Sequence, residues 1–391
     1  MSFEILETET VGTVIKVIGV GGAGGNAVEH MIRRGVQGVE FICANTDHQA
    51  LSRSSAPHAI QLGKTGLGAG SRPEVGREAA IEARERIADA LRGAHMVFIT
   101  AGMGGGTGTG AAPVVAEVAR DMGILTVAVV SKPFDFEGPR RMKAAEAGLI
   151  ELQDKVHSLI VILNSRLEEV LGEDAEMSAC FQAADDVLNN ACAGIAEIIN
   201  TPGLVNVDFE DVKTVMGESG KAMMGTAVAS GADRARVAAE AAVASPLLEG
   251  IDLSGARGVL VNITASGALK MRETREVMDT IRTFAAEDAT VIFGTVQDEL
   301  MGEDLRVTVV ATGLGRTAAM PARRPLVAVP RTGTDNQPMT QAAPPGSHDY
   351  SGLETPAVWR SRETGARGGA LEERDAEARL EIPAFLRKQA D

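Results

Sequence analysis

Short apolar runs alternate with amphipathic stretches through the first half of the chain. The runs cover residues 14–18, 39–44, 96–100 and 125–130, and the amphipathic stretches lie near 26–34, 74–92 and 111–122. Strands that are continuously apolar and separated by helices are typical of a parallel sheet covered on both faces. The first half is therefore predicted to be an α/β domain built on a parallel sheet.

A helical period follows this domain. Apolar residues recur every three or four positions at Phe181, Ala184, Leu188, Cys192, Ile195 and Ile199. This spacing predicts one long central helix near 176–200. Beyond it, apolar runs at 257–264, 290–295 and 305–311 and a helical stretch near 273–286 predict a second, smaller α/β domain with its own sheet.

The composition changes near residue 317. From there to 379 the chain is rich in Pro, Arg, Thr, Gln, Gly and Ser, has no apolar period, and contains the only Trp and Tyr, Trp359 and Tyr350. Such a segment buries too little apolar surface to offset its ordering entropy, so we expect a disordered linker. Apolar residues return at 380–391, which indicates a short C-terminal docking peptide on a tether.

Composition and charge exclude several classes of protein. With 391 residues, 45% of them hydrophobic, the chain is long enough for at least two packed units. The net charge of −15 would repel nucleic acid and anionic lipid, so we expect no nucleic-acid partner. Three cysteines without a CxxC pair fit a reducing, cytoplasmic compartment. The longest apolar runs are far shorter than the roughly 20 residues that cross a bilayer, so direct membrane insertion is not expected.

A first glycine-rich loop follows the first predicted strand. Residues 19–26 satisfy GxGxxG and open a helix, so backbone amides and the helix dipole are available for an anion. Asp47 lies roughly where the acidic residue of a dinucleotide fold would stand. An NAD-dependent oxidoreductase and a purely structural tight turn therefore remain alternatives for this loop alone.

A second glycine-rich loop, 102–110, is more specific. It again joins a predicted strand to a predicted helix, whose first turn is expected to carry Pro113. Neither loop contains Lys or Arg, so phosphate charge would be met by backbone amides, by the hydroxyls of Thr107 and Thr109, and by a metal ion. Small residues at 66–71 form a further candidate loop near a terminal phosphate.

Together these motifs resemble the tubulin/FtsZ superfamily, and most specifically the FtsZ family of bacterial cell-division GTPases. The resemblance covers 14–315 and returns at 382–391. It implies a tubulin/FtsZ-like fold that binds GTP or GDP with Mg²⁺, polymerises head-to-tail, and forms the division ring at midcell in the cytoplasm. The implied parts are a flexible N-terminus (1–12), a GTP-binding domain (13–175), the central helix (176–202), a GTPase-activating domain (203–316), the linker (317–379) and the terminal peptide (380–391).

The resemblance also implies the residues that contact the nucleotide. Those for the phosphates and neighbouring groups are Gly21, Gly22, Ala23, Gly24, Gly25, Asn26, Ala69, Gly70, Gly104, Gly105, Gly106, Thr107, Gly108 and Thr109. Glu137 and Arg141 are placed near the ribose, although their i, i+4 spacing also fits an ordinary surface ion pair.

Phe181 and Asp185 lie one helical turn apart. A base can stack on the ring while the carboxylate, which only accepts hydrogen bonds when ionised, receives N1–H and the amino group of guanine. Adenine lacks these donors at that edge, so this arrangement would select GTP over ATP. The alternative is that Phe181 belongs to the core and Asp185 is solvated.

The catalytic loop implied by the resemblance contains Asn206, Asp208 and Asp211. One subunit would supply these residues to the GTP of the next and polarise the attacking water there, so no monomer would hold a complete site. By sequence alone, Asp208 equally suits a helix N-cap. Departures from the family pattern at 163–165 and 217–221 leave the hydrolysis rate and the filament contacts open, and a non-hydrolysing scaffold remains an alternative.

The C-terminal peptide is the implied partner site. By resemblance it docks onto membrane-tethering division proteins of the actin-like FtsA and ZipA type, and spatial inhibitors of division are further expected partners. The implied anchors are Ile382, Phe385, Leu386, Arg387 and Lys388. A frayed terminus is the alternative.

Overall fold

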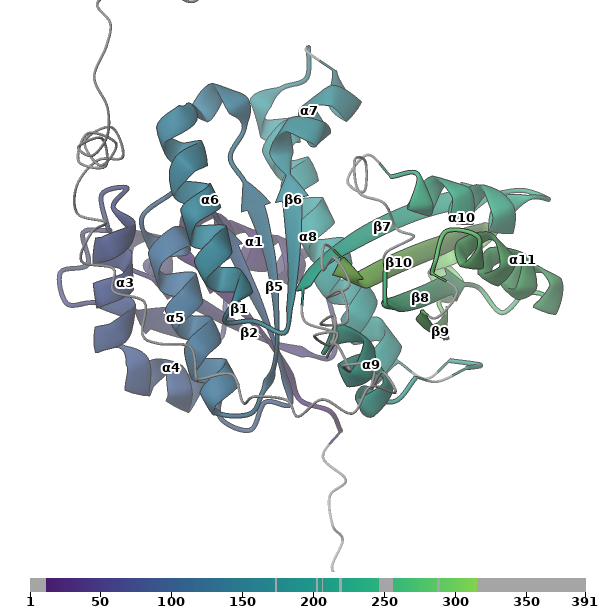
Figure 1. Ribbon diagram of the computed structural model, residues 1–391, viewed down its shortest axis with the longest axis horizontal. Coiled ribbons are helices and arrows are strands. Elements are labelled where there is room, and N and C mark those ends of the chain that lie inside the picture. Colours follow the sequence, from purple (N-terminus) through teal and green to yellow (C-terminus); the bar gives the residue numbers. More distant parts are fainter. Residues whose placement is uncertain are drawn as a thin grey trace, which may run out of the picture. The chain divides into compact units, whose positions relative to one another are not determined.

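A computed structural model describes residues 12–172, 174–201, 203–205, 207–217, 220–245, 256–286 and 289–314 (Figure 1). The strands are β1 Ile15–Val20, β2 Val39–Asn45, β3 His58–Gln61, β4 Met96–Gly102, β5 Leu125–Lys132, β6 Ser158–Leu163, β7 Gly220–Ser230, β8 Gly258–Ala265, β9 Thr290–Gln297 and β10 Asp304–Leu314. The α-helices are α1 Gly21–Arg33, α2 His48–Ser52, α3 Pro73–Glu82, α4 Arg84–Leu91, α5 Thr107–Asp121, α6 Pro139–Gln153, α7 Asn164–Leu171, α8 Met177–Asn200, α9 Phe209–Met216, α10 Arg234–Val243 and α11 Met271–Arg282. Short 3₁₀ helices are η1 Asp135–Glu137 and η4 Glu299–Met301.

Some predicted segments lie outside the described residues. They are residues 1–11 of the predicted N-terminus, Asn206, the linker at 317–379, and the terminal peptide with Ile382, Phe385, Leu386, Arg387 and Lys388. Within the part of the chain that is described, no helix has the length and apolar character needed to span a membrane.

The predicted parallel sheet is confirmed. Strands β1 to β6 pair in the order β3-β2-β1-β4-β5-β6, and every pairing among them is parallel. Successive residues of β1 pack on opposite faces: Val17 lies in a core with Met31 of α1, and Ile18 in a core with Val115 of α5. Both faces are covered, which explains why the strands are apolar without alternation.

The long central helix is also confirmed, as α8. Its buried residues Leu188 and Ile195 join the core formed by α1 and one face of the sheet. The same core includes Leu260 of β8 and Val310 of β10. This helix therefore packs against strands from both halves of the chain (Figure 1).

The prediction of a separate second sheet is wrong. Strands β7, β10, β8 and β9 extend the first sheet to ten strands, because β7 pairs with β6 over Ser158 to Ile160. Only three residue pairs make this junction. They are joined by backbone hydrogen bonds, which do not depend on the side chains, so the apolar pattern could not predict the junction. The pattern likewise did not indicate β7 as a strand.

Two helix boundaries differ from the predictions. The amphipathic stretch 74–92 is divided at Ala83 into α3 and α4. Helix α5 begins at Thr107, so Pro113 lies inside the helix and not in its first turn. The end of the glycine-rich loop itself forms that first turn, and the loop amides therefore belong to the helix N-terminus.

Candidate functional site

The two glycine-rich loops lie side by side at one edge of the sheet. β1 pairs with β4 up to Val20 opposite Ala101, so both strands end together before their loops begin. The strand order places β2 on one side of β1 and β4 on the other. In open parallel sheets, ligands bind outside the carboxyl ends of the strands at this point, where the strand order reverses.

Both helices that follow the loops have free N-terminal ends. α1 and α5 have no side-chain cap and no acidic residue in the first turn. Their unpaired N–H groups and positive dipole ends therefore point toward the space between the loops. An anionic group such as a phosphate is the ligand that this arrangement suits.

A cavity of about 500 Å³ lies beside these helix ends. It is bounded by residues from both loops, from the segment after β5 and from α8. The predicted contacts that line it are Gly22, Ala23, Asn26, Gly105, Gly106, Thr107, Gly108, Glu137, Arg141, Phe181 and Asp185.

The remaining predicted contacts lie around this cavity. Gly70, Gly104 and Thr109 line an adjoining cavity of about 630 Å³, which shares Ser71, Glu137 and Arg141 with the first. Gly21 and Gly25 line a smaller one of about 270 Å³ on the other side of Gly22 and Asn26.

Gly24 and Ala69 are buried and line none of these three cavities. A Cβ at Gly24 would lie 2.3 Å from the carbonyl oxygen of Thr100, so glycine is needed there for α1 to approach β4. Ala69 lies 2.8 Å from where a Cβ at Gly106 would be placed. Both residues shape the loops around the cavity.

Thr109 supports the second loop from within. Its hydroxyl accepts a hydrogen bond of 2.8 Å from the backbone N–H of Gly104, and the residue is buried. Gly104 has φ +95°, which disfavours any side chain there. The Thr109 oxygen thus holds the turn of the loop, and the hydroxyl proton is left for the predicted contact with phosphate.

Glu137 and Arg141 form an ion pair at the cavity wall. They lie on consecutive elements, since Glu137 ends η1 and Arg141 is in α6. The carboxylate of Glu137 also accepts a hydrogen bond of 2.9 Å from the N–H of Phe134. The pair is therefore fixed to the segment after β5.

Phe181 does not belong to the core, since its side chain is 44% exposed at the cavity. Its ring meets that of Phe134 edge-on at 5.3 Å between centroids. Asp185, one turn later, is half-buried. Desolvation raises the pKa of its carboxyl to about 6, while the nearby His30 acts in the opposite direction.

Asn164 is a cavity residue that sequence reasoning missed. It is 5% exposed and lines the cavity, and its Oδ1 has no hydrogen-bond partner within the described residues. A buried amide oxygen without a partner is costly unless a ligand satisfies it. The available signal was its position, because it directly follows the buried strand β6 at the carboxyl edge of the sheet.

Asp208 and Asp211 lie at the opposite edge of the sheet. The ring of Phe209, next to Asp208, contacts the ring of His95, and His95 immediately precedes β4. The second glycine-rich loop follows the other end of this strand of seven residues, so the two sites are separated by about 20 Å along β4. Neither aspartate lines the cavity near the loops.

Two aspartates serve as helix caps. The Asp208 carboxylate accepts a hydrogen bond of 2.8 Å from the N–H of Asp211 and caps α9, so the N-cap interpretation of the sequence is confirmed. Asp47 caps α2 by accepting from Gln49 and Ala50. A carboxylate used in this way is poorly placed for the ribose of a dinucleotide, which weighs against the oxidoreductase alternative.

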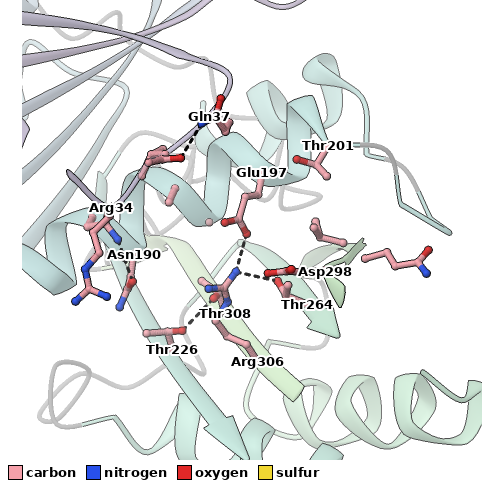
Figure 2. Close-up of a pocket in the computed structure, with 17 residues that line it drawn as sticks. Arg34, Gln37, Asn190, Glu197, Thr201, Thr226, Thr264, Asp298, Arg306 and Thr308 are labelled. Carbon is pink, nitrogen blue, oxygen red and sulfur yellow. Dashed lines mark hydrogen bonds and ion pairs between the residues drawn. The ribbon is translucent and has the colours of Figure 1, made fainter. Parts of the chain in front are cut away.

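A further cavity of about 390 Å³ is lined by residues of α8 and of strands β7, β8 and β10. Figure 2 shows Arg306 of β10 pointing toward Glu197 of α8, to which it is paired at 2.8 Å. Arg306 also donates to the hydroxyl of Thr264 at 3.3 Å. Burial raises the pKa of Glu197, and Arg306 partly offsets this. None of the predicted site residues lines this cleft.

No group of three or more His, Cys, Asp or Glu side chains is arranged to hold a metal ion within the described ranges. The cavity instead offers hydroxyl, amide and backbone groups, the carboxylates of Glu137 and Asp185, and the cationic side chains of Lys132 and Arg141. A Mg²⁺ ion usually keeps several waters and is bound through substrate phosphates. This donor set therefore fits a magnesium ion that arrives with a nucleotide.

Comparisons with known proteins cover both halves of the chain. The family model "Tubulin/FtsZ family, GTPase domain" matches residues 14–172, and "FtsZ family, C-terminal domain" matches 220–315. "Cell division protein FtsZ" of Coxiella burnetii is 55% identical over 392 positions, covering 99% of this chain and 99% of that protein. The protein of the same name from Pseudomonas aeruginosa is 54% identical and covers 100% of both. The structure of an empty FtsZ dimer from M. jannaschii gives a TM-score of 0.74 at 43% identity, covering 78% of this chain and 89% of the other.

Proposed function

This chain belongs to the tubulin/FtsZ family, and from that premise we propose that it hydrolyses GTP at the junction between successive subunits of a head-to-tail filament. Family membership makes it a GTP-binding and GTP-hydrolysing cytoskeletal protein of cell division. The comparisons do not favour the non-hydrolysing scaffold or the oxidoreductase. The division ring at midcell is its expected location, in keeping with the names of its relatives.

The proposed nucleotide lies in the cavity beside the two glycine-rich loops. Its phosphates face the amides at the start of α1 and α5, together with Thr107. The ribose lies near the Glu137–Arg141 pair, and the guanine base stacks on Phe181. Asp185 accepts from the guanine edge, and the unpartnered Oδ1 of Asn164 is a further acceptor.

The separation of the two sites supports hydrolysis between subunits. The cavity lies at the carboxyl edge of the sheet, whereas Asp208 and Asp211 lie at the amino edge. Stacking one copy on the next, carboxyl edge to amino edge, brings the aspartates of one subunit to the nucleotide of the other. Such a contact is heterologous and propagates as a filament. The similar protein from M. jannaschii was solved as a dimer.

The two aspartates have different proposed tasks. Asp208 holds the start of α9 through the N–H of Asp211, and its carboxylate is also proposed to help polarise the attacking water. The Asp211 carboxylate orients the water that attacks the terminal phosphate, because phosphoryl transfer depends mainly on positioning and charge neutralisation. Mg²⁺, when bound with the phosphates, supplies charge neutralisation. Asn206 belongs to the same proposed loop.

Complementation between two inactive variants tests this proposal. Asp211→Ala keeps the nucleotide cavity but lacks the proposed water-orienting group. Gly105→Leu fills the cavity, and a Cβ at this position meets nothing closer than the Arg141 guanidinium at 3.9 Å. Asp211→Ala alone should bind GTP without hydrolysing it. Gly105→Leu alone should neither bind nor hydrolyse GTP.

A mixture of the two should regain activity, because one subunit offers the nucleotide and its neighbour offers Asp211. If the two variants assemble in random order, about a quarter of the junctions in an equal mixture would combine an intact nucleotide cavity with an intact Asp211. A mixture that stays inactive while both proteins co-sediment, or full turnover by isolated wild-type protomers, would contradict hydrolysis between subunits. Mixing Asp211→Ala with Asp208→Ala is the control, since neither supplies an intact loop.

The C-terminal peptide is proposed to dock onto membrane tethers of the FtsA and ZipA type. Support comes from its sequence, in which Ile382, Phe385 and Leu386 are followed by two basic residues. Deleting 380–391 should leave GTP-dependent sedimentation unchanged and abolish recruitment to tether-coated vesicles. Impaired polymerisation would argue against a separable docking role.

A further inference from the structure

Thr46 and Thr107 connect two segments that border the phosphate end of the cavity. Their hydroxyl oxygens are 2.6 Å apart. Thr46 directly follows β2 and is 3% exposed. Thr107 is the first residue of α5 and lines the cavity. A hydrogen bond therefore joins the hydroxyl of a buried residue to that of a residue lining the cavity.

The backbone of Thr46 also holds the loop that contains Ala69 and Gly70. Its carbonyl oxygen accepts a hydrogen bond of 3.1 Å from the N–H of Gly68. It accepts another, of 3.2 Å, from the side-chain amide of Gln61. Thr46 is thus bonded through its hydroxyl to one loop at the cavity and through its carbonyl to another.

The proton count of the two hydroxyls limits how they can be oriented. Each hydroxyl has one proton to donate and can accept two hydrogen bonds. In the described part of the structure, the Thr46 hydroxyl has Thr107 as its hydrogen-bond partner. Ionised phosphate oxygens only accept, so Thr107 must use its single proton to bind one. The hydrogen bond between the threonines must then be donated by Thr46.

We propose that Thr46 is a positioning residue for the nucleotide phosphates, which donates to Thr107 and so directs the Thr107 proton toward a phosphate oxygen. This inference rests on the proposed function, because it requires phosphate beside Thr107. A chain of hydrogen bonds in a buried setting is polarised along its length. Fixing the direction of a donor before the ligand arrives also reduces the entropy lost on binding.

Thr46→Val removes the donor while nearly preserving shape. The affinity for GDP and GTP should fall by about three- to tenfold, in line with the loss of one hydrogen bond in such a chain. Guanosine, which has no phosphate, should bind Thr46→Val as it binds the wild type. Thr46→Ser restores the hydroxyl and should restore GDP affinity. Thr46→Ala provides a second donor-free variant if valine does not fold at this buried position.

A double-mutant cycle separates positioning from general damage. If Thr46 acts through Thr107, then Thr46→Val should have no further effect on GDP affinity in a Thr107→Val background. The matched control is Thr226→Val, which breaks another threonine pair, Thr226 with Thr308 at 3.1 Å, in the distant cleft. That control should leave GDP affinity unchanged.

The outcomes distinguish a failure of the positioning role of Thr46 from a failure of the proposed nucleotide site. Unchanged GDP affinity in Thr46→Val, an equal loss of guanosine affinity, or additive effects of the two threonines would overturn the positioning role while leaving the nucleotide site intact. If the wild-type protein binds guanosine as tightly as GDP, the phosphate site itself is wrong and both proposals fail. Titration calorimetry on the full chain measures all of these affinities.

Discussion

The ring of Phe209 meets the ring of His95 edge-on, with 6.2 Å between centroids, and this contact places α9 at the amino edge of the sheet. His95 precedes β4, and the second glycine-rich loop follows it. The two candidate halves of the hydrolytic site therefore lie at opposite ends of one strand. This separation is what the proposed hydrolysis between two subunits requires.

Replacing Asp208 should separate its structural task from its chemical one. Asp208→Ala removes the cap of α9 and should lower the free energy of unfolding by about 1 kcal/mol. Asp208→Ser keeps a capping oxygen, so its urea midpoint should stay near that of the wild type, while GTP hydrolysis should still fall because the carboxylate is missing. Wild-type turnover by Asp208→Ser would show that the carboxylate acts only as a cap.

The affinity for GTP should depend on pH through Asp185. Its pKa of about 6 in the free protein means that below this pH the carboxyl is increasingly protonated and loses acceptor capacity. Affinity should then fall by up to about tenfold for each pH unit below 6. Asp185→Asn should show no such slope between pH 5 and 7. Equal slopes in fluorescent-GDP titrations of both proteins would exclude Asp185 as the source.

Asp185 should also make the free energy of unfolding depend on pH. Lower pH should weaken GTP binding through this group but stabilise the fold. Because burial raises the pKa of Asp185 from 3.8 to about 6, the folded protein binds more protons than the unfolded chain between these values. The contribution of this group to the free energy of unfolding therefore rises as pH falls through 6 and is complete near 4. Comparing urea midpoints of the wild type and Asp185→Asn across this range isolates the contribution.

Arg306→Ala should destabilise the protein by about 1 to 2 kcal/mol at neutral pH, because it leaves the partly buried Glu197 carboxylate without its partner. The existing elevation of the Glu197 pKa by burial would increase. The loss should therefore shrink as pH falls and the carboxyl becomes protonated. Glu197→Gln in the Arg306→Ala background should recover part of the stability, measured by thermal unfolding. A loss that is independent of pH would contradict this account.

The ion pair of Arg234 and Glu273 is the most buried in the described part of the chain, with side chains 6% and 7% exposed. Glu273 also accepts from the N–H of Lys270 at the start of α11. Arg234→Leu should cost about 3 to 5 kcal/mol, since it leaves a buried charge unpaired. Replacing both residues, as Arg234→Leu with Glu273→Leu, should cost less than Arg234→Leu alone. Additive losses in chemical denaturation would show that the pair is not coupled.

Local pattern was sufficient for the elements that create the site. The apolar runs, the period of α8 and the two glycine-rich loops were all predictable, because strand burial, helix amphipathicity and turn chemistry depend on neighbouring residues. The location of Asn164 at a strand end was visible as well, but nothing in the chain marked its amide oxygen as unpartnered. The domain limits and the roles of the site residues stay predictions.

The sequence by itself determined the alternation of strands and helices and the positions of the two glycine-rich loops, since these follow from patterns of a few residues. Only the tertiary structure decided that β7 joins β6, that the Glu137–Arg141 pair lies at the cavity wall, and that Thr46 meets Thr107. It also decided that Asp208 and the second glycine-rich loop lie at opposite edges of the sheet. These relationships join residues far apart in the chain or depend on where helices and strands end. Both are set by how the whole chain packs.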